Sequence, residues 1–169
     1  STRSAHSDGA TVTNSSDYVA WGEAASGDLV LDPGLWSIDA FGKTVIALIH
    51  NAEVFSWNAD ASNATSTRAT IISGAPTASR HMLVSTPDRH LVFFGTETTV
   101  GTQSSQDAMF IRFSDQENID GTDAYTVTAE NTAGTQRLAA GSKIMGAIRG
   151  RDAIYVWTDT ALFLMTFVG

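Results

Sequence analysis

The chain has 169 residues, which is the length of one ordinary domain, and 43% of them are hydrophobic, enough to bury a core. Its net charge of −8, from 18 acidic and 10 basic residues, disfavours binding to the phosphate backbone of nucleic acids, which requires clustered Lys and Arg. Because the chain has no Cys, a disulfide framework, a thiolate metal site and a Cys nucleophile are excluded.

The chain begins with a segment, residues 1–34, that we expect to be less regular than the rest. It lacks an initiator Met and the apolar stretch of a signal peptide, so we interpret the chain as trimmed or as part of a longer protein. The longest apolar run is Thr44 to Ile49, far below the roughly 20 residues of a spanning helix. The sequence therefore predicts no membrane segment.

The remainder predicts strands, and windows with helical spacing of apolar residues are almost absent. Val45 to Ile49 and Val54 to Trp57 form one expected hairpin, with a polar turn between them. Met82 to Ser85 and His90 to Phe94 form a second hairpin, with Pro87 in its turn. A three-stranded meander is expected near the end, over Ile144 to Ile148, Ala153 to Trp157 and Ala161 to Val168.

A weak repeat runs through these strands, in which a strand ends on an aromatic residue followed by a small polar residue or Gly. The endings lie about 40 residues apart or somewhat less, which is the size of a four-stranded propeller blade. The sequence thus predicts a single all-β domain over residues 1–169, a meander of three to four propeller-like blades that forms either a minimal propeller or part of a larger one. The alternative is a β-sandwich, which uses the same short strands. Two polar stretches, Asn58 to Arg68 and Thr96 to Asp107, are expected to be exposed loops.

The densest acidic group holds the only metal candidate, a weak Ca²⁺ site at Asp115, Glu117, Asp120 and Asp123. Oxygen ligands at this spacing suit Ca²⁺, and Gly121 permits a sharp turn, but the order does not match the EF-hand pattern. A solvated turn that closes a hairpin is the simpler interpretation, so we expect neither a metal nor another cofactor.

No catalytic residue is predicted. His81 and His90 flank the second hairpin and are placed to face each other across its strands, but two His without a third ligand make a poor zinc site. A Gly-x-Ser-x-Gly elbow and a phosphate-binding Gly-rich loop are both absent. The four Trp residues have two interpretations: packing between adjacent sheets, which we favour, or lining a sugar-binding groove. These residues are Trp21, Trp36, Trp57 and Trp157.

Four segments occur in an order that resembles tail proteins of short-tailed, podovirus-like phages. They are residues 112–118 (RFSDQEN), 131–134 (NTAG), 141–142 (GS) and 157–162 (WTDTAL). Matching segments cover roughly residues 105–169, with weaker similarity around residues 35–57. The chain is similar to β-propeller tail hub or nozzle proteins and to packaged-DNA stabilisation proteins. It departs from them at Gly121 to Tyr125, where relatives carry Trp and Pro, and in stopping at Gly169.

The resemblance implies a virion structural protein without enzymatic activity, located in the phage tail. Its partners would be copies of itself and other tail proteins, arranged as a homo-oligomeric ring around the DNA channel. We expect no sequence-specific nucleic acid binding. An acidic channel wall would repel the phosphates and let the genome slide through.

Two other functions fit the residues alone. A carbohydrate- or receptor-binding β module would expose two or more Trp residues in a shallow groove. A hydrolase on a propeller would bring carboxylates and His together in a central pocket.

Overall fold

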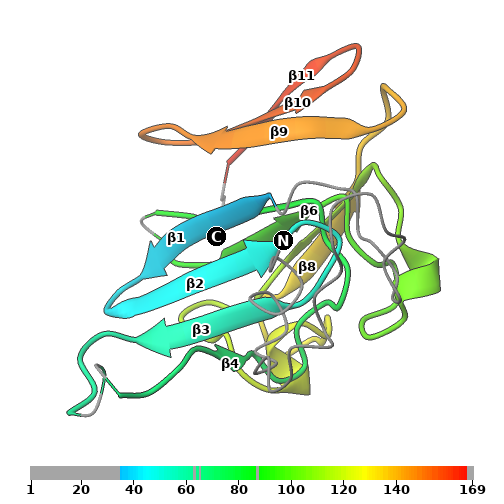
Figure 1. Ribbon diagram of the computed structural model, residues 1–169. Coiled ribbons are helices and arrows are strands. Elements are labelled where there is room, and N and C mark those ends of the chain that lie inside the picture. The colour runs from blue at the N-terminus through cyan, green and yellow to red at the C-terminus, as the bar shows by residue number, and fades with distance from the viewer. Residues whose placement is uncertain (1–34, 63, 65, 87, 167–169) are drawn as a thin grey trace, which may run out of the picture. The chain divides into compact units, whose positions relative to one another are not determined.

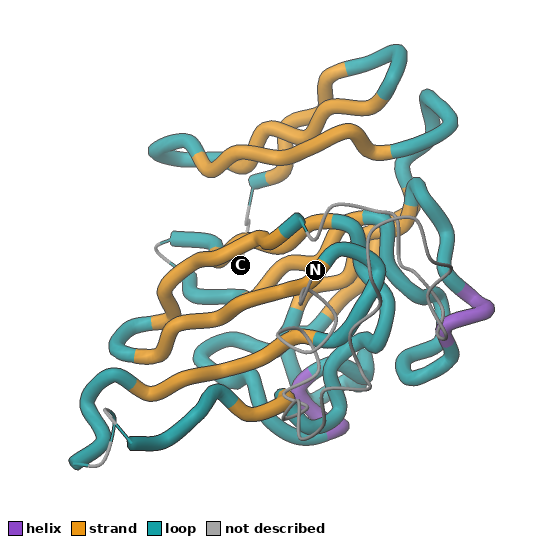
Figure 2. Tube along the Cα trace, viewed as in Figure 1, coloured by secondary structure: helices purple, strands orange, loops and turns teal. Residues whose placement is uncertain are grey.

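The computed structural model describes residues 35–166, except residues 63, 65 and 87. The segment 1–34 that the sequence predicts to be less regular, with Trp21, lies outside the described residues. Eleven strands and two short 3-10 helices make up the described part, and no α-helix occurs in it (Figures 1 and 2). The prediction of an all-β fold is confirmed.

Three antiparallel sheets follow one another along the chain, and in each of them neighbouring strands are consecutive in sequence. Sheet 1 consists of β1 (Trp36–Phe41), β2 (Thr44–Ile49), β3 (Val54–Asn58) and β4 (Thr70–Ile71). Sheet 2 consists of β5 (His81–Val84), β6 (Leu91–Phe94), β7 (Phe110–Phe113) and β8 (Gly134–Arg137). Sheet 3 consists of β9 (Ile144–Arg149), β10 (Ile154–Thr158) and β11 (Leu162–Met165).

Short turns join most strands, whereas the two longest connections lie in sheet 2. The 3-10 helix η2 (Gln103–Ser105) is part of the connection between β6 and β7, and η3 (Thr122–Ala124) is part of the one between β7 and β8. The β7–β8 connection is held by Tyr125, whose hydroxyl donates a hydrogen bond of 2.6 Å to the carbonyl oxygen of Ile119. Burial raises the pKa of this phenol, which keeps the donor protonated.

Sheet 2 lies between the other two sheets, and both of its faces are buried. Because side chains alternate along a strand, Leu91 and Phe93 of β6 face sheet 1 while Val92 and Phe94 face sheet 3. The first contact buries Ile46, Leu48 and Val54 of sheet 1 against Met82, Val84, Leu91 and Phe93 of sheet 2. The second buries Leu83, Val92, Phe94 and Ile111 of sheet 2 against Ile154, Val156 and Phe163 of sheet 3. A strand buried on both faces requires a continuous apolar run, which LVFF supplies.

The first strands of successive sheets are neighbours: β1 lies beside β5, and β5 lies beside β9. The sheets therefore pack face to face in chain order, with their first strands brought together at one edge. In this arrangement the first and the last sheet each have one outward side, and these two sides are described below.

The two predicted hairpins and the predicted meander correspond to β2–β3, β5–β6 and β9–β11. The prediction of an exposed loop over Asn58 to Arg68 agrees with its largely exposed described residues. For Thr96 to Asp107 the prediction is wrong at the start, because Thr96 and Glu97 are buried. Their burial depends on groups distant in sequence, since the Oε1 atom of Glu97 accepts a hydrogen bond of 3.1 Å from the amide of Thr77.

Candidate functional site

The outward side of sheet 1 is an apolar surface, which we call the N-terminal open face. Its residues alternate with those that pack on sheet 2 and meet across the strands in register: Ile38 is paired with Ala47, and Ala47 with Phe55. The face consists of Trp36, Ile38, Ala40, Val45, Ala47, Ile49, Phe55, Trp57 and Ile71. It carries no charged side chain, and Ile38 at its edge is 66% exposed.

The outward side of sheet 3 is a second apolar surface, which we call the C-terminal open face. Tyr155 is paired with Ile148 on one side and Leu164 on the other, and Trp157 with Gly146 and Leu162. Met145 is exposed next to the irregular pairing at Trp157 and Thr158. The face consists of Met145, Gly146, Ile148, Tyr155, Trp157, Leu162 and Leu164. Leu164, on the edge strand β11, is 61% exposed.

Nearly all the large hydrophobic side chains that the described residues expose belong to these two faces. Apart from them, only Leu35, which directly precedes β1, and Val127, in the β7–β8 connection, are exposed in this way. Contiguous apolar patches of this kind are uncommon on soluble monomers and mark interaction sites. No described segment covers either face, so the two faces are the candidate functional surface of this chain.

At the shared edge, two sets of hydrogen bonds connect the first strands β1, β5 and β9. In the first set, the Oγ atom of Ser37 lies 2.8 Å from Nδ1 of His81, and Nε2 of His81 lies 3.2 Å from the carbonyl oxygen of Ala147. The carbonyl can only accept, so Nε2 carries the proton and Nδ1 accepts from the Ser37 hydroxyl. Burial lowers the pKa of His81, which favours this neutral imidazole.

In the second set, one carboxylate oxygen of Asp39 accepts two hydrogen bonds. The amide of Val84 donates to it at 2.8 Å and the guanidinium of Arg149 at 2.9 Å. Arg149 also donates to the carbonyl oxygen of Val84 at 2.6 Å. Since Ser37 precedes Asp39, His81 precedes Val84 and Ala147 precedes Arg149, the three first strands run in the same direction.

The four acidic residues of the Ca²⁺ candidate each have a different hydrogen-bond or ion-pair partner. The carboxylate of Asp115 accepts hydrogen bonds from the amide and hydroxyl of Thr132, which lower its pKa. Glu117 forms an ion pair with Arg89. Asp120 accepts from the amide of Gly121 at 3.1 Å, and Asp123 contributes its backbone carbonyl to a bond from Asn131.

These contacts are those of a hydrogen-bonded turn. Across residues 35–166 outside the three gaps, no group of three acidic or histidine side chains lies close enough to hold a metal ion. What the arrangement does is fix the β7–β8 connection: the side chain of Asp115 holds Thr132, just before β8 begins.

The expectation that His81 and His90 face each other is wrong. In the register of the hairpin His81 is paired with Phe94, while His90 lies at the turn. His81 belongs to the edge that joins the first strands, and Nδ1 of His90 lies 2.8 Å from the carbonyl oxygen of Ser114. The error comes from the length of the strands, which separates the two ends of the hairpin by four residues.

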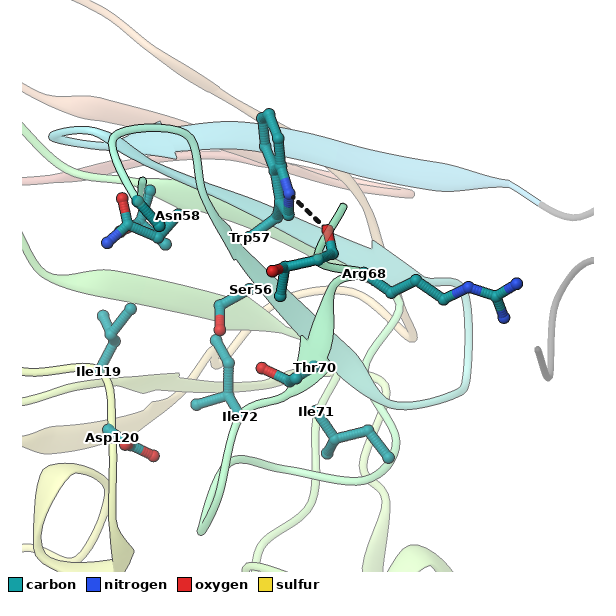
Figure 3. Close-up of a pocket in the computed structure, with 12 residues that line it drawn as sticks. Ser56, Trp57, Asn58, Arg68, Thr70, Ile71, Ile72, Ile119 and Asp120 are labelled. Atoms are coloured by element: carbon teal, nitrogen blue, oxygen red, sulfur yellow. Dashed lines mark hydrogen bonds between the residues drawn. The ribbon is translucent and has the colours of Figure 1, made fainter. Parts of the chain in front are cut away.

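The three described Trp residues lie on the open faces, which differs from the expected packing between sheets. Trp36 and Trp157 are 49% and 41% exposed. Trp57 borders a cavity of about 350 Å³ between sheet 1 and the β7–β8 connection (Figure 3). Its indole N–H donates to the carbonyl oxygens of Ala64 and Thr67, at 3.2 and 3.0 Å. Figure 3 shows the side chain of Arg68 extending away from this indole.

A buried polar cluster in sheet 2 was not predicted from the sequence. Arg112 is buried and donates to the carbonyl oxygens of Glu97, Thr98 and Tyr125, at 3.3, 2.9 and 2.8 Å. Its guanidinium holds the start of the β6–β7 connection against the end of η3. Arg112 and Glu97 are both buried, and the attraction between their opposite charges offsets part of the cost of placing each in the interior.

No protein family, no curated protein and no solved structure matches the chain. The resemblance to phage tail proteins therefore stays a prediction. Within the part of the chain that the structure describes, no helix is long and apolar enough to cross a membrane.

Proposed function

We propose that the chain is a structural subunit of a short-tailed phage tail, at the hub or nozzle, with no enzymatic role. The observation that carries this proposal is the pair of apolar open faces at the two ends of the three-sheet stack. A structural subunit of an assembly must present apolar surfaces that become buried against neighbouring subunits. The resemblance of residues 112–118, 131–134 and 157–162 supports the location in the virion.

The finer architecture that we propose is a partial β-propeller, with each sheet as one blade. Propeller blades are antiparallel meanders of four strands arranged around a central channel. Three observations support this assignment: the meanders follow in chain order, they pack face to face, and their first strands gather at one edge (Figure 1). Sheet 3, with three strands, would be an incomplete blade.

In this proposal copies of the chain and other tail proteins form a ring around the DNA channel. The net charge of −8 fits a wall that repels phosphate groups and lets the genome pass without sequence-specific contacts. The first strands supply the wall in a propeller; the opposite charges that they carry here, Asp39 and Arg149, form an ion pair, so the repulsion comes from the net charge of the whole chain.

The second candidate function, a carbohydrate-binding module, is favoured by one observation, the cavity beside Trp57. Its volume of about 350 Å³ suits a small ligand, and an indole face can stack on a sugar ring. The two functions conflict at Trp57, because assembly covers this side chain whereas sugar binding requires it to be accessible. Saturable binding of a soluble oligosaccharide by a chain that stays monomeric would favour the second function.

The proposal is tested by the mass of the chain in solution. We expect the unsubstituted chain to form a discrete oligomer, measured by light scattering after size exclusion. Ile38→Glu places a charge on the N-terminal open face and should raise the dissociation constant at least about tenfold, because a charge buried without a partner is costly.

The matched control is Val127→Glu, since Val127 is 53% exposed but lies outside both open faces. This variant should keep the mass of the unsubstituted chain. A monomeric unsubstituted chain, or equal effects of the two substitutions, would contradict the proposal.

A further inference from the structure

The two open faces are opposite sides of equivalent sheets. For each sheet we define the forward face as the side toward the next sheet in the chain, and the back face as the other side. The forward face of sheet 1, with Ile46 and Leu48, packs on the back face of sheet 2, with Met82 and Val84. The N-terminal open face is therefore the back face of sheet 1.

The same relation holds at the second contact. The forward face of sheet 2, with Val92 and Phe94, packs on the back face of sheet 3, with Ile154 and Val156. The C-terminal open face is therefore the forward face of sheet 3. Both contacts inside the chain join a forward face to a back face. The back face of sheet 1 and the forward face of sheet 3 remain without a partner sheet among the described residues.

The direction of the strands distinguishes the ways in which two copies can meet. The first strands β1, β5 and β9 run in the same direction, as the two sets of bonds, one through His81 and one through Asp39, together require. A second copy that packs forward on back continues this order, with its β1 beside β9 in the same direction. A contact between two back faces would turn one copy over and break the order.

The composition of the two faces also fits a contact between copies. Neither face carries a charged side chain, although the chain has a net charge of −8, so the contact brings no like charges together. Each face holds large aromatic residues of the kind that anchor interfaces: Trp36 and Trp57 on one, Tyr155 and Trp157 on the other. A nucleic acid, which needs cations, does not fit either face.

We propose that the C-terminal open face of one copy packs on the N-terminal open face of a second copy, as sheet 1 packs on sheet 2 within the chain. This inference rests on the proposed function, because it specifies the partner of the same faces. The contact is heterologous, so copies close into a ring if the rotation between them divides a full turn and otherwise extend as a filament.

A mixing experiment with two variants tests the pairing. Ile38→Glu damages only the N-terminal open face, and Leu164→Glu damages only the C-terminal open face. In a solution of either variant every contact contains one damaged face, so both variants alone should be monomeric. In an equimolar mixture the intact C-terminal open face of Ile38→Glu meets the intact N-terminal open face of Leu164→Glu. The mixture should yield a dimer of one copy of each variant and nothing larger.

Native mass spectrometry identifies this dimer when one variant is labelled with ¹⁵N. Because both substituted positions are exposed, the fold should persist, and near-UV circular dichroism of each variant checks that it does. Val127→Glu, mixed with either variant, serves as the control for charge alone.

The outcomes separate this inference from the proposed function. If the unsubstituted chain assembles but Leu164→Glu alone still forms a dimer with itself, back faces pair with each other and the head-to-tail contact is wrong. If the unsubstituted chain assembles but the mixture stays monomeric, the contact is likewise wrong, while assembly stands. If the unsubstituted chain is a monomer whose open faces are covered by residues 1–34, both proposals fail.

Discussion

His81 is the residue whose ionisation bears most directly on how the first strands hold together. Both of its ring nitrogens are in hydrogen bonds that suit a neutral imidazole, one with Ser37 and one with Ala147. Protonation would place a second N–H opposite Ser37 and a charge in a partly buried position, and this loss of solvation lowers the pKa of His81.

A pH dependence of stability follows from this shift. In the unfolded chain His81 takes up its proton near the ordinary value of 6.5, whereas in the folded chain it does so only at lower pH. The free energy of unfolding should therefore fall as the pH drops below about 6.5, and level off once the pH is below the folded pKa of His81. Urea unfolding between pH 7 and pH 5, compared between the unsubstituted chain and His81→Gln, isolates this contribution.

The His81→Gln variant should show a shallower decrease over this range, whatever its absolute stability. The pKa values of three carboxylates are also lowered, those of Asp107, Asp115 and Asp159. They affect the free energy of unfolding at lower pH, because the stability they contribute is lost only below about pH 4. Equal slopes for the two proteins between pH 7 and pH 5 would contradict the role assigned to His81.

The apolar strands were predictable from the local pattern, but which of their faces is buried depends on tertiary contacts. Buried and more exposed side chains alternate in β2 and β10, yet TVIALI and IYVWT are apolar almost throughout and do not indicate which set points inward. Glu97 lies in a polar stretch and looks exposed, and only its contacts with Thr77 and Gly101, together with the nearby Arg112, make its burial possible. No pattern within the stretch itself signals this.

At the scale of elements, the strands that were predicted are those with a dense apolar run and a polar turn beside it. The strands that were not predicted, β1, β4 and β8, lack such a run. The four residues of β8 are Gly134, Thr135, Gln136 and Arg137, and this strand exists because it pairs with β7. The start positions of the sheets, Trp36, His81 and Ile144, are unevenly spaced, since the long β7–β8 connection interrupts the repeat.

Two strand glycines give a matched test of how tightly the elements pack. A side chain at Gly134 would meet the ring of Phe113 on the paired strand, with the Cε2 atom at 2.7 Å. At Gly146, on the C-terminal open face, an added methyl group would meet nothing within 4 Å. Neither position has a positive φ, so backbone strain does not distinguish them.

Gly134→Ala should lower the free energy of unfolding by about 1–3 kcal/mol, because the aromatic ring must move out of a packed position. Gly146→Ala should change it by less than about 0.5 kcal/mol. Urea unfolding of both substitutions in the Ile38→Glu background removes the contribution of assembly. A large loss for Gly146→Ala, or none for Gly134→Ala, would show that the strands do not pack as described.

At the scale of the whole molecule, the described part has a buried central sheet and, at each end, a sheet with one apolar face that no described segment covers. Sheet 2 is covered on both faces, while sheets 1 and 3 each bury one face and leave the side chains of the other exposed or half-buried. From the sequence the aromatic residues on the open faces were expected inside, since an apolar strand pattern is the same whether its partner is in the same chain or in another. The open faces became visible only once the number and order of the sheets were known.

Single-particle imaging of the assembled chain tests the central claim most directly. Our account predicts a closed ring in which the sheets stand face to face around an axis, with β1, β5 and β9 innermost and both open faces covered by neighbouring protein. An isolated three-sheet particle, or an assembly in which the faces holding Ile38 and Leu164 remain in contact with solvent, would contradict it.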